Sequence, residues 1–452
     1  MAKSPVRDMT QGSPTKLILG FFFPLLLGLL FQQLYNMVDT MIVGRFLGVQ
    51  ALAGVGSTGS VTFLVMGFCN GICNGFAIPV AQKFGEGDYA GLKRFVVNAL
   101  MTAVVLSLAI TLLVCALCGQ MLVWMNTPED IMTDAYAYLF IIFLGIPVMF
   151  LYNSMAGIIR SLGDSRSPVT YIIISSILNV VLDLVFILWF RMGVAGAAWA
   201  TVISQAVSAL LCVRYLYRSD VIIFYRTDWK LEWPVVRHLM GMGLPTGMQY
   251  SITAVGSIVM QTAVNGLGSI YVASMAAGGK VSQIFFCPFD AMGSTMATYA
   301  GQNVGAGKLD RIGKGLRSCS ALGVVYAVLA FLVLFFFGRE LTMLFVDGAE
   351  KEVLDNAHLL LKLNGAFLVP LAFVNIVRFL IQGLGFTRQA VFAGVFEMFA
   401  RSILGFVLVP AYGYLAACFG HPAAWIAADI FLFPAYFWAM KKLRREQQKA
   451  IA

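Results

Sequence analysis

The sequence carries little charge. Asp, Glu, Lys and Arg make up 12% of its 452 residues, and hydrophobic residues make up 60%, whereas ordinary soluble domains are about 25% charged. A water-soluble core cannot bury that much apolar surface, so the composition excludes an ordinary soluble protein. The apolar runs, such as 25–31 and 324–337, are continuous. Continuous runs exclude the alternating pattern of an outer-membrane barrel and predict membrane-spanning helices.

Histidine is scarcer still, with three residues that lie near the ends of apolar runs or in loops. No nucleophile with a neighbouring base is visible, so we expect no enzymatic activity. The eight cysteines fall mostly inside apolar runs, and two pairs have helical spacing without a histidine nearby. We interpret them as free thiols that pack as small hydrophobic side chains, not as metal ligands.

Nucleotide-binding motifs are also lacking. Gly54, Gly56 and Gly59 have the spacing of a dinucleotide fingerprint, but they lie between two apolar spans and not between a strand and a helix. Gly307-Lys308 lacks the upstream glycine and the following hydroxyl residue of a P-loop. We therefore expect no cofactor and no ATP-driven step, so any process that needs energy must draw it from an ion gradient or from the substrate.

Twelve spans are predicted, which makes the chain an all-α polytopic membrane protein. The first apolar run is too long for the core of a signal peptide and lacks a cleavage site, so we interpret it as a retained helix. The spans are 17–44, 52–82, 95–118, 132–158, 168–190, 195–217, 236–266, 273–300, 313–337, 354–382, 389–410 and 421–440.

Basic residues indicate the orientation. With the N-terminus inside, most of the 31 Lys and Arg fall in cytoplasmic segments, as the positive-inside rule requires. Both termini are thus predicted to be cytoplasmic. The net charge of +9 then reflects these loops, and no nucleic-acid partner is expected.

The chain also repeats itself. Pro24, Pro147 and Ala197-Ala-Trp199 recur as Pro245, Pro370 and Ala423-Ala-Trp425, at offsets that rise from 221 to 226. The repeat predicts two pseudo-symmetric six-helix lobes with the same membrane orientation, an architecture typical of transporters. The predicted domains are an N-lobe at 1–217, a cytoplasmic linker at 218–235 and a C-lobe at 236–452.

Eight ionisable residues fall at membrane depth, where charge is expensive and a function is the first hypothesis. The alternative is a structural ion pair. Glu397 and Arg401 are four residues apart and could pair with each other, whereas Lys280 and Asp290 are too far apart along one helix to do so. The eight are Asp39, Asp183, Lys280, Asp290, Arg378, Glu397, Arg401 and Asp429.

The first half carries a polar stripe on its first span, at positions i, i+3, i+4 and i+7. Span 5 adds an Asn and an Asp four residues apart, and span 6 adds a Thr at a similar depth. Two close carboxylates with an amide and a hydroxyl suit Na⁺ or an exchangeable proton, although a hydrogen-bond network between helices is the alternative. The stripe is Gln32, Tyr35, Asn36 and Asp39, and the predicted cation-coupling site is Asp39, Asn179, Asp183 and Thr201.

The second half does not repeat this site. Arg401, Gly405 and Ala427 stand where Asn179, Asp183 and Thr201 would recur, so coupling is predicted only in the first half. Pro24 and Gly28 are the predicted hinge of span 1, because proline removes a backbone hydrogen bond. The predicted substrate-lining residues are Gln32, Tyr35, Asn36, Asn153, Lys280, Asp290, Arg401 and Asp429.

Four motifs are spread along nearly the whole chain. They are Tyr35-Asn36 with Asp39 and Gly44-Arg45, Arg160 to Arg166, Gly301-Gln302 with Gly305 and Gly307, and Trp425 with Asp429. Together they resemble landmarks of the multidrug and toxic compound extrusion (MATE) family. The chain is identified as similar to the prokaryotic DinF-like branch, in which Asp39, Asn179, Asp183 and Thr201 match the first-lobe site. Another branch uses acidic residues in helices 7 and 10, and this sequence has none in 236–266.

The resemblance implies an antiporter that exports organic, cationic or amphiphilic xenobiotics in exchange for H⁺ or Na⁺ by alternating access. It also implies a functional monomer in the lipid bilayer of a prokaryotic plasma membrane, acting on small molecules. The alternative from the same superfamily is a lipid-linked oligosaccharide flippase, for which Lys280, Arg378 and Arg401 leave room.

Overall fold

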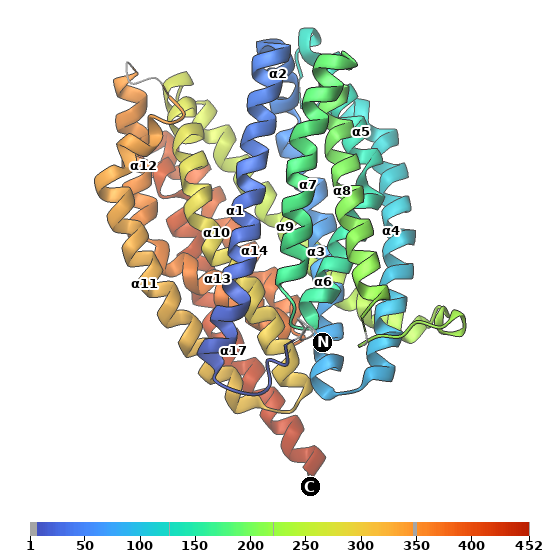
Figure 1. Cartoon of the computed structure of the whole chain (residues 1–452). Coiled ribbons are helices and arrows are strands. Elements are labelled where there is room, and N and C mark those ends of the chain that lie inside the picture. The colour runs from blue at the N-terminus through green and yellow to red at the C-terminus, as the bar shows by residue number, and fades with distance from the viewer. Residues whose placement is uncertain (1–6, 126, 220, 347–349, 452) are drawn as a thin grey trace. The chain divides into compact units, whose positions relative to one another are not determined.

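The computed structural model describes residues 7–125, 127–219, 221–346 and 350–451. Across these ranges the chain is helical and has no β-strand, as predicted (Figure 1). Residues 1–6, 126, 220, 347–349 and 452, which the predicted lobes and linker include, lie outside the described residues.

The helices follow the predicted spans closely. Most begin and end a few residues outside the predicted limits, because helices continue past the hydrocarbon boundary into polar sequence. In the first half they are α1 Pro14–Leu47, α2 Val49–Ser57, α3 Gly59–Glu86, α4 Tyr89–Trp124, α5 Glu129–Leu144, α6 Ile146–Ser161, α7 Arg166–Leu184 with the π-turn η1 Val185–Trp189, α8 Val194–Tyr217 and the short 3₁₀ turn η2 Arg226–Asp228. In the second half they are α9 Trp233–Asn265, α10 Ser269–Gly305, α11 Leu309–Thr342, α12 Lys351–Ala366, α13 Leu368–Gly383, α14 Thr387–Ile403 with η3 Leu404–Leu408, α15 Val409–Tyr412, α16 Tyr414–Cys418 and α17 Gly420–Ile451.

Within the described ranges, nine helices are long and apolar enough to cross a membrane, and two bent pairs raise the number to eleven. The bends are 45° between α5 and α6 and 54° between α12 and α13. They lie just before Pro147 and Pro370, the repeated prolines, whose missing N–H groups leave these turns without a full set of helical bonds. The remaining predicted span corresponds to α9, which is 33 residues long but is less apolar than the other eleven spans.

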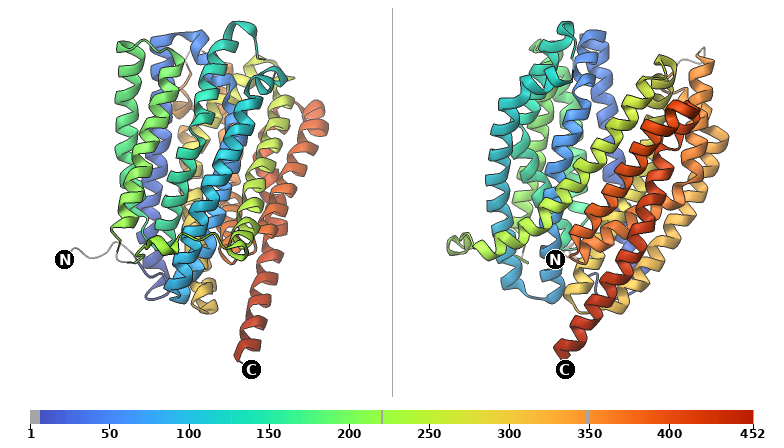
Figure 2. Two further views of the ribbon diagram at one scale, coloured as in Figure 1. Left: turned by 90° about the vertical axis from the view of Figure 1, so that its right-hand side faces the viewer. Right: turned by 180° about the vertical axis from the view of Figure 1, so that it is seen from behind.

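The described chain divides into two compact units. Unit 1 holds residues 7–8 and Phe23–Gly247, and unit 2 holds Met9–Phe22 and the described part of Met248–Ala452. Of the three boundaries between the units, the one between Asp8 and Met9 precedes α1. The other two fall inside α1 and α9, within two residues of Pro24 and Pro245, and both helices are continuous (Figures 1 and 2). The compact units therefore begin and end at residues that differ from the predicted lobe limits. Those limits rest on the sequence repeat and stay a prediction.

Close backbone packing holds the first half of α9 in unit 1. A Cβ atom added at Gly75 of α3 would lie 2.6 Å from Cα of Gly243, and one added at Gly71 would lie 2.7 Å from Cα of Gly247. The two helices can approach this closely only because these positions have no side chain.

Hydrogen bonds hold residues 9–22 in unit 2. The Met9 N–H donates to Oε1 of Gln302 over 2.8 Å, and Nζ of Lys308 donates to the carbonyl of Thr10 over 3.0 Å. The segment before and inside the start of α1 is thus bound to α10 and the turn that follows it.

The predicted linker is bound to the start of α4 within unit 1. Lys93 forms an ion pair with Asp228 at 2.8 Å, and Arg94 forms one with Glu232. The Lys93 bond and the N–H of Tyr225 lower the pKa of the Asp228 carboxyl below its ordinary value. Asn98 of α4 accepts from the Glu232 N–H over 2.7 Å, so the linker is anchored by backbone as well as by charge.

We predict that Gly75→Ala lowers the stability of the solubilised protein by about 1–3 kcal/mol, the usual cost of overpacking. The measurement is thermal unfolding in detergent. Gly241→Ala in α9 is the matched control, because nothing lies within 4 Å of its added Cβ and alanine favours helix. Equal stability of the two variants would contradict glycine-mediated packing of α3 and α9.

Candidate functional site

Unit 1 encloses a cavity of about 290 Å³ between α1, α3, α5, α6, α7 and α8. Its lining is polar but uncharged: amides and hydroxyls alternate with tyrosine, methionine and isoleucine side chains. Four of the predicted substrate-lining residues belong to it, namely Gln32, Tyr35, Asn36 and Asn153. The polar stripe of α1 therefore faces an internal space, although its role in binding substrate stays a prediction.

The four predicted coupling residues come together beside this cavity. Asn179 and Thr201 are part of its lining, and Nδ2 of Asn179 donates to Oγ1 of Thr201 over 3.5 Å. The carboxyl groups of Asp39 and Asp183 are within hydrogen-bonding reach of each other. Residues from three helices thus form one cluster, as the spacing predicted.

The cluster has acceptor oxygens but too few donors. Oδ1 of Asp39, Oδ1 of Asn179 and both carboxylate oxygens of Asp183 are buried and accept no hydrogen bond from any residue that the structure describes. Asp183 is fully buried. Buried polar atoms in folded proteins are normally paired, and oxygen atoms such as these are paired by a proton or by a hard cation.

The cluster does not resemble a transition-metal site. In the described part of the chain, no group of three or more His, Cys, Asp or Glu residues could hold a metal ion. The cysteines described here are free thiols, and all but Cys115 are buried, as the sequence predicted. An alkali ion could still use the two carboxylates together with the Asn179 and Thr201 oxygens.

Sequence reasoning missed part of the cavity wall. Gln205 of α8 lies against Tyr35 as a hydrogen-bond partner, and Thr62 and Asn70 of α3 present buried oxygens with no partner among the described residues. All three line the cavity. The signal was available, because Thr62 and Asn70 share a helix face and Gln205 is one turn beyond Thr201.

The other predicted substrate-lining residues belong to unit 2 and not to this cavity. Arg401 is buried, Asp290 and Lys280 are exposed, and Lys280 lies 5.8 Å from the ring centre of Phe345. Asp429 has a buried Oδ1 without a partner in the described ranges. Their contact with substrate stays a prediction.

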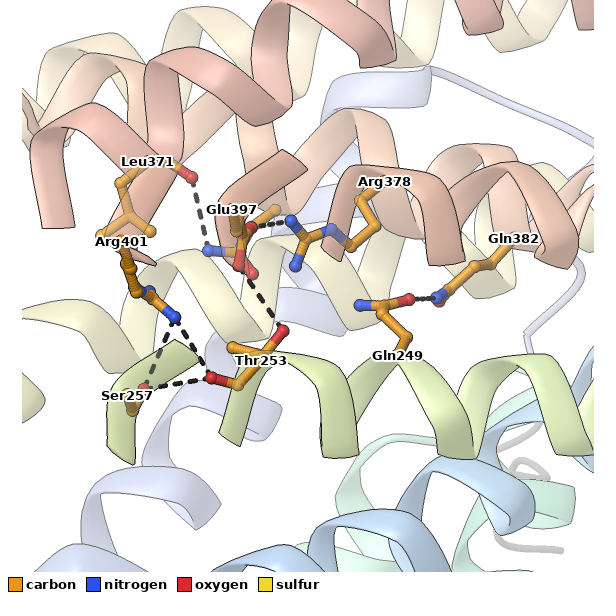
Figure 3. Close-up of polar contacts among 9 residues, drawn as sticks. Gln249, Thr253, Ser257, Leu371, Arg378, Gln382, Glu397 and Arg401 are labelled. Carbon is orange, nitrogen blue, oxygen red and sulfur yellow. Dashed lines mark hydrogen bonds and ion pairs between the residues drawn. The ribbon is translucent and has the colours of Figure 1, made fainter. Parts of the chain in front are cut away.

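The pairing of Glu397 differs from the one that helical spacing allowed. Glu397 forms its ion pair with Arg378 of α13 and not with Arg401 four residues away (Figure 3). The reason is geometric: α13 packs directly against α14, so the guanidinium of Arg378 contacts the carboxylate of Glu397 across the two helices. Arg401 instead extends towards α9.

Comparison with known proteins decides the family. The family model MatE matches the chain twice, over residues 24–185 and 245–407. The protein belongs to the MATE family. The two matches begin 221 residues apart, so the internal repeat is confirmed, and the chain is a multi-pass membrane transporter.

Individual MATE proteins resemble the chain along most of its length. The "probable multidrug resistance protein YpnP" of Bacillus subtilis is 29% identical over 82% of each chain, and YoeA of the same species is 27% identical over 93% of each. A crystal structure of MATE in complex with MaL6 has a TM-score of 0.89 at 19% identity and covers 99% of this chain and 100% of its own. This structural likeness confirms the predicted fold class.

Two buried aspartates allow a test of the donor shortage. Asp164 is 1% exposed and accepts from the N–H groups of Arg166 and Ser167 and from the hydroxyls of Ser167 and Tyr215. We predict that Asp164→Asn lowers stability by about 1–3 kcal/mol, because hydrogen bonds to a charged group are lost. Asp183→Asn should instead raise it by about 0.5–2 kcal/mol, as replacing a strained functional residue often does.

The measurement is thermal unfolding of both purified variants in detergent at pH 8 without Na⁺. A loss of stability in Asp183→Asn as large as that in Asp164→Asn would mean that Asp183 is satisfied by the protein, which contradicts the donor shortage.

Proposed function

We propose that the protein is a cation-coupled antiporter that exports organic amphiphiles in exchange for H⁺ or Na⁺ by alternating access. The observation that carries this proposal is the cluster of Asp39, Asn179, Asp183 and Thr201. Its buried oxygens lie beside a cavity and have no partner in the part of the chain that the structure describes, so they need an exogenous positive charge. The names of the relatives YpnP and YoeA as probable multidrug resistance proteins support xenobiotics as the substrates.

The cavity supports an amphiphilic substrate. Its wall mixes amide and hydroxyl groups with tyrosine and methionine side chains, which together can accept an aromatic body and several hydrogen-bonding groups. Since Asn179 and Thr201 line the cavity and also bond to each other, an ion bound there changes the wall that a substrate contacts. Competition for this shared wall is a physical basis for exchange.

Helix α1 supplies a route from ion binding to movement. Pro24 interrupts its hydrogen bonds at the point where the helix passes from unit 2 to unit 1. At Gly28 an added Cβ would lie 2.7 Å from Cγ2 of Val169, so α1 packs closely on α7 one turn later. We infer that α1 bends at Pro24 and Gly28 when Asp39 gains or loses a positive partner.

The proposal places the protein in the plasma membrane of a prokaryote, with both termini in the cytoplasm and one chain as the working unit. The bias of Lys and Arg towards the loops on the N-terminal side supports this orientation.

Asp39→Asn is predicted to abolish ion-driven transport, with uptake lowered about tenfold or more, because a charge-assisted contact contributes about 1.5–3 kcal/mol. The amide of this variant can neither take up and release a proton at physiological pH nor balance the charge of a bound cation. The measurement is dye uptake into inverted vesicles, with Na⁺ and pH gradients imposed separately. Asp130→Asn, an exposed acid of the same unit, is the control. Uptake at the level of the unmodified protein in Asp39→Asn would overturn the coupling role.

A further inference from the structure

Two buried arginines in unit 2 lie near a single carboxylate, and only one of them pairs with it. Arg378 of α13 is 7% exposed and Arg401 of α14 is 4% exposed. Glu397 forms its ion pair with Arg378 (Figure 3), and its other oxygen accepts from Oγ1 of Thr253 over 3.5 Å. Arg401 has no ion pair with any residue in the described ranges. Its charge lies at membrane depth with only the already paired Glu397 close enough to offset it, which is costly.

The protein contacts of Arg401 use one nitrogen. Nη1 donates to the backbone carbonyl of Thr253 over 3.3 Å and to Oγ of Ser257 over 3.4 Å. Within the described chain, its other N–H groups have no acceptor. Nε of Arg378 is fully buried and has no hydrogen-bond partner among the described residues. No nitrogen of Arg401 is both buried and without a partner. One edge of the guanidinium is therefore free to donate.

Nearby acids do not supply the missing charge. The charged groups close enough to act on Arg401 are Glu397, which is already paired, and Arg378, which repels it. Asp290 and Asp429 act on Arg378 and not on Arg401. His421 also feels the charge of Arg401, but it can add no negative charge.

The Arg401 side chain is held in place. A Cβ added at Gly256 of α9 would lie 3.3 Å from Cδ and 3.6 Å from Nη1 of Arg401, so the guanidinium lies directly over the bare backbone of α9. An arginine that bonds inward at this depth is not extended towards the membrane surface to reach water. The position is built for the charge.

The internal repeat relates this place to the cavity of unit 1. The two family matches are offset by 221 residues at their starts and 222 at their ends. With these offsets Arg401 corresponds to Asn179, Thr253 to Gln32 and Ser257 to Asn36. All three counterparts in the first half line the unit 1 cavity. The same positions that present neutral groups to a ligand in unit 1 thus present a fixed cation in unit 2.

We propose that Arg401 is an anion-binding residue that recognises a carboxylate or phosphate group on an amphiphilic substrate. The free edge of the guanidinium can donate two parallel hydrogen bonds to either group, which is the geometry that arginine favours. The inference rests on the proposed export of amphiphiles and names their class: molecules with an aromatic or acyl body and one anionic group, zwitterions included.

The test uses two dyes that differ at one group. Rhodamine 110 carries a free carboxylate, and rhodamine 123 is its methyl ester. Equilibrium binding of each dye is measured by fluorescence anisotropy on the full-length protein in nanodiscs, without any ion gradient. We expect Arg401→Gln to weaken rhodamine 110 binding about tenfold or more and to leave rhodamine 123 binding within twofold. Arg388→Gln, an exposed arginine of the same helix, should change neither.

A second variant separates charge from packing. Arg401→Lys keeps the positive charge and should restore part of the preference for rhodamine 110. Equal weakening of both dyes in Arg401→Gln would overturn the proposal, and so would no effect of that variant on either rhodamine 110 or the anionic lipid described below. So would an Arg401→Lys protein that binds as Arg401→Gln does. Because no gradient is used, failure of ion coupling would leave this binding result intact.

A lipid arm identifies the source of the anion. Flipping of fluorescent phosphatidylglycerol in proteoliposomes is compared between the unmodified protein and Arg401→Gln. A loss confined to the lipid assigns the anion to a phospholipid headgroup, and a loss confined to rhodamine 110 assigns it to a carboxylate substrate. Loss of neither contradicts the site.

Discussion

A pair of carboxylates buried at membrane depth, without donors to Asp183 among the described residues, is the constraint on which the proposed transport depends. Asp39 and Asp183 face each other, and the described protein supplies no donor to Asp183. Two carboxylates in such a place need a proton or a cation from outside. In the proposed antiport, the adjoining cavity, whose wall includes Asn179 and Thr201, brings such an ion and an organic molecule to the same few side chains. Under this proposal, the shortage of donors among the described residues is what makes the site responsive to a gradient.

Two helices, α1 and α9, each belong to both compact units. Both helices are continuous, and the division lies beside Pro24 or Pro245. The C-terminal halves of the two helices have different surroundings. The polar stripe of α1 faces a cavity, whereas Gln249, Thr253 and Ser257 of α9 bond to α13 and α14.

The repeated frame carries opposite charges in its two halves. The bends before Pro147 and Pro370 and the π-turns after α7 and α14 recur, so the backbone is duplicated faithfully. The side chains at matching positions are not: Asn179 stands beside carboxylates, and Arg401 stands beside backbone and hydroxyl oxygens. The same backbone arrangement can thus place an exchangeable cation in one half and the fixed positive charge of an arginine side chain in the other.

The sequence by itself determined the spans, the repeat and the cluster of Asp39, Asn179, Asp183 and Thr201. Hydropathy and helical spacing are local properties, and burial at a shared depth limits where such groups can meet. Only the tertiary structure decided that Glu397 pairs with Arg378, that Gln205 joins the cavity, and that α1 and α9 divide between units. Those outcomes depend on contacts between residues far apart in the chain. Helical spacing allowed Glu397 a partner on its own helix, and the packing of α13 against α14 provided another.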